Sequence, residues 1–120
     1  MLPQKMKISE KAFTSLRRLQ NNTGLTVNIG ARLAFFASIE RGFTWEGEDI
    51  QLTQRELDKY TWLGDYGDVV EMLLKQKYPN LEEKDYYKAW GCHVDDGAIE
   101  LSSKQSISDL KTEYINGKQH

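Results

Sequence analysis

The feature that most constrains the fold is a pair of helix signals separated by the tight turn Asn22-Thr23-Gly24. The first signal begins at Ser9, whose hydroxyl can accept a hydrogen bond from a free backbone N–H group of the first turn. Gly24 can adopt the left-handed conformation that ends many helices. Thr26 provides a second N-cap, and Gly42 ends the second helix as Gly24 ends the first. The sequence therefore predicts a helix–glycine turn–helix hairpin.

The two helices of this hairpin differ in their apolar patterns. The first has a core stripe at helical spacing, formed by Ala12, Phe13, Leu16 and Leu19. The second has a wide apolar face that includes Ile29, Leu33, Phe36, Ala37 and Ile39. A helix this apolar must pack on more than one side, either within the chain or against a second subunit. The candidates for a turn and assembly element are Gly24, Leu25, Gly30 and Ala34.

Outside the hairpin, the sequence predicts further short elements. Polar and apolar residues alternate from Gln4 to Ile8, which permits a short strand, and residues 43–64 are expected to form a loop with short strands or a helical turn. A third helix is expected to start at Asp65 and to bury Val69, Val70, Leu73 and Leu74. A capping box of Asn80 and Glu83 would open a long helix reaching about Leu101, packed tightly at Gly91 and Gly97. A short last helix is predicted over residues 106–115.

These patterns predict a mainly α, compact single domain of about five helices, with one or two short strands. A chain of 120 residues can bury a core without disulfides, and we expect one domain over residues 1–120 with flexible ends at about 1–4 and 117–120. Cys92 is the only cysteine, which suits a reducing cytoplasm. No stretch approaches the roughly 20 apolar residues of a membrane span, so secretion and membrane insertion are not expected.

The net charge of −2 conceals a strong asymmetry along the chain. Residues 1–41 carry +5 and the remainder carries −7. The basic residues of the first part are Lys5, Lys7, Lys11, Arg17, Arg18, Arg32 and Arg41. This distribution suggests a polyanion-binding face on an otherwise acidic body, although a solvated helix face also explains it.

The sequence contains few candidate catalytic residues. Cys92 and His93 are neighbours on a predicted helix and point about 100° apart, so they cannot form a nucleophile–base pair. We expect Cys92 to be a small buried hydrophobe and His93, with Asp95 and Asp96, to belong to a polar helix face. No phosphate-binding loop, dinucleotide fingerprint or zinc-protease motif occurs. We therefore expect no enzyme activity from this chain alone, no cofactor and no metal site.

Binding is better supported than catalysis. A strand with outward Lys5 and Lys7, followed by a helix, a turn and a helix, matches the order of a ribbon-helix-helix DNA-binding module, although an ordinary helical hairpin has the same order. Free N–H groups at Val27 and Asn28, with the Thr26 hydroxyl, would form a phosphate site. The candidate phosphate-contacting residues are Lys5, Lys7, Lys11, Arg17, Arg18, Thr26, Asn28 and Arg32.

The stretch NNTGLTVNIGARLAFFASIERGF resembles the R-x-TGLTPN-x-x-x-R-x-A-x-x-x-S-(L/I)-E region of the DndE family of DNA sulfur modification proteins. YTWLGDY and KAWGCHVDDGAIEL resemble the second and third signature regions of that family, and the resemblance covers roughly residues 8–105. Val27 stands where the family has proline, and residues 46–58 match only loosely. By position, Thr23 to Thr26 and Asn28 correspond to the structural turn, and Arg32 to a charge whose role is open.

The resemblance implies a helical protein that self-associates, as a tetramer, within the DNA phosphorothioation machinery. It implies an accessory subunit that binds duplex DNA with a preference for nicked DNA, while partner proteins such as DndC and DndD carry out the chemistry. Two alternatives stay open at this point. One is a scaffold that assembles the modification enzymes, and the other is a ribbon-helix-helix-type regulator that reads sequence through Lys5 or Lys7.

Overall fold

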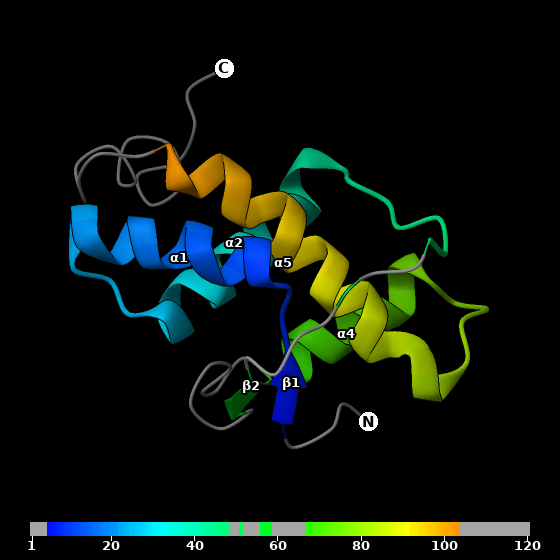
Figure 1. Ribbon diagram of the computed structural model, residues 1–120. Coiled ribbons are helices and arrows are strands. Elements are labelled where there is room, and N and C mark those ends of the chain that lie inside the picture. Colours follow the sequence, from blue (N-terminus) through cyan, green and yellow to red (C-terminus); the bar gives the residue numbers. More distant parts are fainter. Residues whose placement is uncertain (1–4, 49–50, 52–55, 59–66, 104–120) are drawn as a thin grey trace.

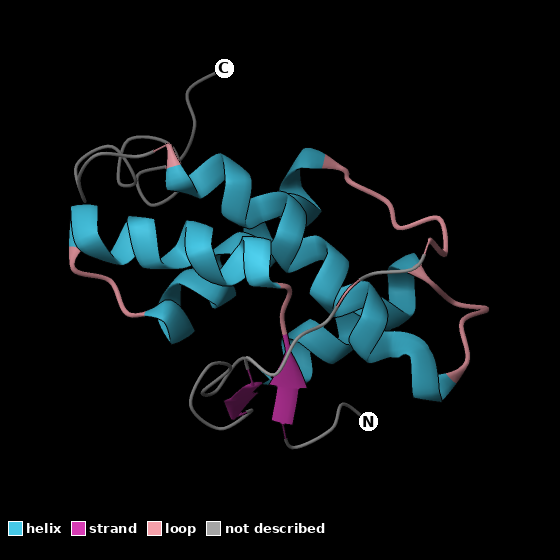
Figure 2. Cartoon of the chain, viewed as in Figure 1, coloured by secondary structure: helices cyan, strands magenta, loops and turns pink. Residues whose placement is uncertain are grey.

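Helices make up most of the part of the chain that the structure describes (Figures 1 and 2). This computed structural model describes residues 5–48, 51, 56–58 and 67–103. In chain order the elements are β1 (Lys5–Lys7), α1 (Glu10–Thr23), α2 (Val27–Arg41), β2 (Glu56–Asp58), α4 (Gly67–Lys77), the 3-10 turn η2 (Glu83–Asp85) and α5 (Tyr86–Ser102). The mainly α fold class is confirmed. The expected helix start at Asp65, the last helix at 106–115 and the flexible ends lie outside the described residues.

The N-terminal hairpin forms with the caps that the sequence predicts. The Ser9 hydroxyl accepts a hydrogen bond from the Ala12 N–H group at 3.0 Å and so begins α1. Gly24 ends α1 in the left-handed conformation, with φ of 82°. The Thr26 hydroxyl accepts from the Ile29 N–H group at 3.3 Å, and Gly42 ends α2, again with φ of 82°. Each helix therefore starts and stops through local chemistry.

The core lies where α5 packs against both helices of the hairpin. Figure 1 shows α5 running beside α1 and across α2, with α4 near its first half. Every third or fourth residue of α5 is buried, including Trp90, Val94, Ala98 and Leu101. From α1 the same core receives Ala12, Leu16 and Leu19. The core stripe predicted for α1 is confirmed at these three residues, and Phe13 is partly buried against the same core.

The closest helix–helix contact is between Gly97 of α5 and Ala34 of α2. A Cβ atom at Gly97 would overlap the Ala34 carbonyl oxygen and lie 2.8 Å from the Ala34 Cα atom. The two backbones therefore touch, which only glycine permits on the α5 side. This contact confirms the tight packing predicted at Gly97.

The same contact explains why α2 buries a different face from the one expected. Its buried residues are Gly30, Ala31, Ala34, Phe35, Ala37 and Ser38. Of the expected apolar face, only Ala37 is buried, whereas Leu33, Phe36 and Ile39 are half-buried and Ile29 is 38% exposed. Close approach of α5 brings small side chains of α2 to the point of contact, while Phe35 is fully buried and Leu33, Phe36 and Ile39 are only partly buried against the core.

Three other expectations are wrong. Val69 of α4 is 38% exposed, because α4 buries Val70 and Leu74 and turns Val69 outward. No Asn80–Glu83 capping box forms, since the chain enters α5 through η2, whose N-cap makes no side-chain hydrogen bond. His93 is fully buried instead of lying on a polar face, because it falls on the inward side of α5 between Ala89 and Gly97.

The strand pair forms within the chain. β1 pairs antiparallel with β2, placing Lys5 opposite Asp58 and Lys7 opposite Glu56. Met6 and Ile8 are buried, as the alternation predicts. The ribbon-helix-helix alternative requires β1 to pair with the strand of a second chain, and the observed partner is instead β2 of the same chain. The fold thus departs from that module.

We expect Gly97→Ala to lower the free energy of unfolding by about 2–4 kcal/mol, because its Cβ atom would overlap backbone that cannot move without separating α2 from α5. Chemical denaturation of the full chain measures this change. The matched control is Gly30→Ala, whose Cβ atom would lie 3.1 Å from the flexible end of Leu16 and should change stability by less than about 1 kcal/mol. Equal stability of the Gly97→Ala variant and the wild type would contradict the backbone contact.

Candidate nucleic-acid interface

The outer face of α1 is polar and rich in hydrogen-bond donors. Its exposed residues are Glu10, Lys11, Thr14, Arg17, Arg18, Asn21 and Asn22. These positions recur every three to four residues, opposite the buried stripe of the same helix. Arginine, lysine, hydroxyl and amide side chains are the groups that most often contact DNA phosphates. We call this set the α1 face.

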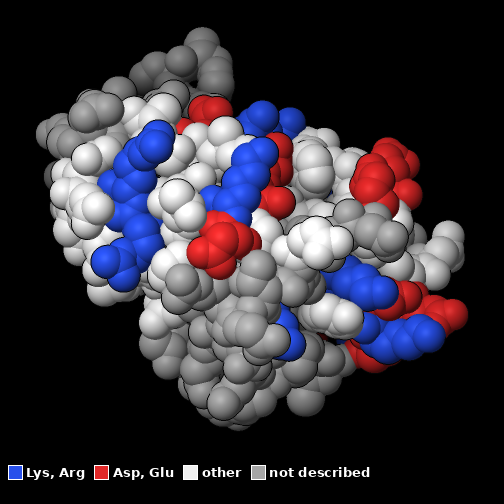
Figure 3. All heavy atoms as spheres, in the orientation of Figure 1, with Lys and Arg blue, Asp and Glu red and all other residues white. Residues whose placement is uncertain are grey.

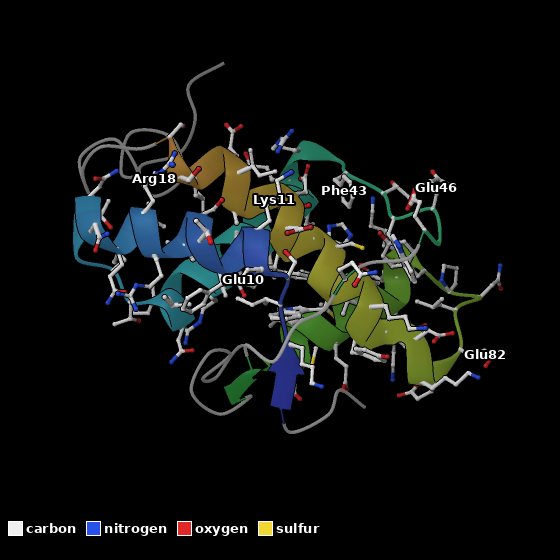
Figure 4. The ribbon with its side chains drawn as sticks, in the orientation of Figure 1. Glu10, Lys11, Arg18, Phe43, Glu46 and Glu82 are labelled. Carbon is white, nitrogen blue, oxygen red and sulfur yellow. The ribbon has the colours of Figure 1, made fainter. Side chains whose placement is uncertain are left out.

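Three cations give the α1 face its charge. Lys11 and Arg18 are seven residues apart, so they share one edge of the helix about 10.5 Å apart along its axis. Figure 4 shows both on that edge, with Glu10 on the other side of the helix. The guanidinium of the third, Arg17, lies 6.0 Å from the centre of the Phe13 ring. The ring therefore supports Arg17 without neutralising it.

The cations of α1 differ from those at the opposite end of the molecule in their ion pairing. Near η2, the pairs are Lys75–Glu83 at 3.9 Å, Lys84–Glu82 at 3.5 Å and Lys88–Asp85 at 3.4 Å. Within the described ranges, no carboxylate lies within ion-pair distance of Lys11, Arg17 or Arg18. Figure 3 shows one stripe of blue side chains on the left, a second near the centre with red groups beside it, and blue mixed with red on the right. The α1 face is thus the part of this surface best suited to an external anion.

The start of α1 is fixed to α5 by polar contacts. The Ser9 hydroxyl donates a short hydrogen bond to the Asp95 carboxylate while accepting from the Ala12 N–H group. The Asp95 carboxylate also lies at the positive end of the α1 dipole, which stabilises the helix. A phosphate close to the first backbone N–H groups of α1 is therefore disfavoured, and the side chains of Lys11, Arg17 and Arg18 remain as the candidate contacts.

The turn between α1 and α2 carries the other predicted contacts. Thr26 is exposed, whereas Asn28 and Arg32 are half-buried. The first turn of α2 contains no acidic residue, so its free N–H groups face no negative side chain of their own helix. Leu25 is half-buried against the core, and the Leu25 N–H group donates to the Thr23 hydroxyl at 3.2 Å. The structure thus places Thr26 at the surface beside a stable turn.

Two residues predicted for assembly are used inside the chain instead. Ala34 is fully buried against Gly97, and Gly30 packs on Leu16 and Leu19 of α1. The chain's own helices thus cover both residues, and a role in contacting a second subunit stays a prediction. Gly24 is exposed and shapes the turn.

Lys5 and Lys7 lie on a different element from the α1 cations. Both lie on β1, and the strand register places an acidic residue of β2 opposite each of them. Lys7 is half-buried. Lys5 and Lys7 are thus set apart from the α1 cations by their place in a strand pair, and their contact with DNA stays a prediction.

The buried histidine was missed by the sequence interpretation. His93 lies three residues after Trp90 and seven after Tyr86, so it occupies the same helical stripe as the apolar core. That spacing was the sequence feature that could have predicted the burial of His93.

Cys92 is half-buried against the core, and burial raises the pKa of its thiol to about 12.

No cation site or membrane helix is found in the described part of the chain. Within residues 5–48, 51, 56–58 and 67–103, no group of three or more His, Cys, Asp or Glu side chains could hold a metal ion. Among the same residues, no helix combines the length and apolar character needed to cross a membrane.

A family model described as DNA sulphur modification protein DndE matches residues 5–109. The chain belongs to the DndE family. This result confirms the resemblance seen in the TGLT turn and the two later signature regions, and it assigns the chain to a family involved in DNA sulphur modification. No curated protein matched the chain.

Solved DndE structures share this fold. The crystal structure of DndE from Escherichia coli B7A, involved in DNA phosphorothioation modification, is 44% identical with a TM-score of 0.75. The match covers 84% of this chain and 99% of the E. coli chain. A crystal structure of a glycine-to-lysine DndE mutant involved in DNA phosphorothioation is 42% identical, with a TM-score of 0.76 and the same coverage of both chains.

Proposed function

We infer that this DndE-family chain is a non-catalytic accessory subunit of DNA phosphorothioate modification that binds the duplex backbone through the α1 face. The observation that carries this proposal is the exposure of Lys11, Arg17 and Arg18 without a carboxylate partner among the described residues. Cations in that state gain most from a phosphate, because no existing ion pair must first be broken.

The proposal divides the candidate residues by role. Lys11, Arg17 and Arg18 provide the main charge, and Thr26 with Asn28 adds hydrogen bonds at the start of α2. Arg32 lies within the first two turns of α2 and is half-buried. We therefore assign it a secondary role in contacting DNA. Lys5 and Lys7 are assigned a minor role, because they lie on β1 and not on the helix that carries the other three cations.

Family membership supports a proposal for the wider setting of the chain. We propose that the chain works in the cytoplasm with other sulfur-modification proteins such as DndC and DndD, which would carry the chemistry. We also propose that it assembles as a tetramer and prefers nicked duplex. Exposed apolar side chains support self-association, since Ile29 and Val69 are each 38% exposed and Met72 is 51% exposed.

The same exposed side chains support a second candidate function, a scaffold that holds the modification enzymes together. In that case the apolar surfaces would bind partner proteins and the α1 face would contact DNA only incidentally. The two functions differ in whether the isolated chain binds DNA through its basic residues.

Reversing two charges on the α1 face tests the leading proposal. We expect Arg17→Glu with Arg18→Glu to weaken binding to a duplex at least tenfold and to flatten the slope of log K against log salt by about 2, since each phosphate contact contributes about 0.9. Fluorescence anisotropy at several salt concentrations measures both quantities.

The control is Lys84→Glu with Lys88→Glu, which changes the net charge by the same amount at residues already paired with acids. It should change affinity less than threefold. If both double variants lose affinity equally, net charge and not the α1 face governs binding, and the proposal is wrong.

Nicked and intact duplexes of one sequence test the expected preference. We predict tighter binding to the nicked duplex, because a nick lowers the energy needed to bend DNA onto a curved protein surface. Anisotropy gives the affinities, and light scattering on the same samples gives the oligomer size. Equal affinity for both duplexes would contradict the preference, and no binding to either would favour the scaffold.

A further inference from the structure

We propose that His93 is a neutral relay between Ser38 and Tyr78 that latches residues 43–48 onto the helical core, and that protonation of its imidazole opens this latch locally. This inference rests on the hydrogen bonds around His93 and does not depend on DNA binding. It concerns a conformational device that involves none of the three cations of the α1 face.

Four elements meet at this histidine. The Ser38 hydroxyl of α2 lies 2.8 Å from His93 Nδ1, and the Tyr78 hydroxyl, just after α4, lies 2.6 Å from Nε2. The Tyr78 hydroxyl also accepts a hydrogen bond from the Trp45 backbone N–H group at 2.8 Å. His93 and Ser38 are fully buried. The chain of contacts thus joins α2, α5, the end of α4 and the segment after α2.

The donor and the acceptor in each hydrogen bond of His93 follow from the groups present. A phenol has one proton, and the Trp45 N–H group already donates to the Tyr78 oxygen. The acceptor for the Tyr78 proton within the described ranges is His93 Nε2, and their 2.6 Å separation suits an O–H donor. Nε2 therefore carries no proton, and the neutral ring keeps its proton on Nδ1, which donates to Ser38. Tyr86 holds Tyr78 in place by donating from its hydroxyl to the Tyr78 carbonyl at 2.8 Å.

The segment that these hydrogen bonds hold, residues 43–48, makes few other polar contacts with the rest of the protein. Residues 43–48, marked by Phe43 and Glu46 in Figure 4, follow the end of α2. The Phe43 ring stands edge-on to the His93 ring with centroids 5.1 Å apart, and Trp45 is 9% exposed. The Trp45 indole N–H group donates to the Glu48 carbonyl, inside the same segment. Among the described residues, the Trp45–Tyr78 hydrogen bond is therefore the one that ties this segment to the end of α4.

Protonation of His93 would disturb this arrangement. An imidazolium has two N–H donors, so Nε2 could no longer accept from Tyr78, and the Tyr78 oxygen would face two donors at once. Burial first, and the Lys77 charge second, lower the pKa of His93 to about 4. A histidine released to solvent titrates near 6.5. The open state therefore binds a proton before the closed state does, so the latch is fully stable above about pH 6.5 and weakens as the pH falls towards 4.

Other ionisable groups lie around the His93 site on the elements that pack against it. At the end of α4, burial raises the pKa of Tyr78, which stays a phenol at neutral pH, and the Cys92, Glu46 and Glu48 groups add to that rise. From α5, Asp95 acts on Cys92, and Asp96 is paired with Arg41 of α2. The group that α2 places on the ring, Ser38, is uncharged.

Nuclear magnetic resonance of the full chain tests both parts of the proposal. In a His120→Asn background, which leaves His93 as the single histidine, we expect the imidazole nitrogens at pH 7 to show the proton on Nδ1. In Tyr78→Phe, hydrogen exchange of the Trp45 amide should accelerate at least tenfold relative to the Leu16 amide, which reports the global stability of each variant. In the parent chain the same ratio should rise as the pH falls from 6.5 to 4.5, after correction for intrinsic exchange.

The control is Tyr87→Phe, because Tyr87 is half-buried on α5 and its hydroxyl makes no hydrogen bond to a described residue. It should leave the Trp45 to Leu16 exchange ratio within twofold of the parent. A proton on Nε2 at pH 7 would overturn the relay. A Trp45 amide that exchanges in step with Leu16 in Tyr78→Phe would overturn the latch.

Discussion

The backbone contact between Gly97 and Ala34 sets the arrangement of the whole described structure. Because α5 approaches α2 closely enough to exclude a Cβ atom at Gly97, the residue of α2 at the point of contact is the small Ala34. The position of α5 in turn determines which residues of α1 face inward, since α5 also packs along that helix. Lys11, Arg17 and Arg18 point outward because the apolar stripe on the opposite side of α1 packs into the core with α5.

This contact also separates two surfaces of different character. Leu33, Phe36 and Ile39 of α2 are only half-buried, and Ile29 is left partly in solvent, which suits association with another protein. The α1 face is polar and keeps its cations free of acidic partners among the described residues. A small helical chain can in this way present one surface for assembly and another for a phosphate backbone.

The helix ends could be predicted from the sequence, and the packing faces only in part. Ser9, Gly24 and Thr26 act through neighbours within three or four residues, so their roles can be read locally. The buried side of α2 could not, because it depends on a glycine more than sixty residues later. His93 was misplaced for a related reason, since its polar ring satisfies its hydrogen bonds with partners from α2 and from the end of α4. The exposed face of α1 was predictable from periodicity, but the pairing of β1 with β2 was not.

Chemical-shift mapping of the isotope-labelled full chain during titration with a nicked duplex tests the central claim most directly. We predict that the largest amide shifts will occur on the α1 face, at Lys11, Thr14, Arg17 and Arg18, and at the first turn of α2. The ion-paired corner around η2 should change little. Largest shifts at Lys84 and Lys88, with α1 unaffected, would contradict the account.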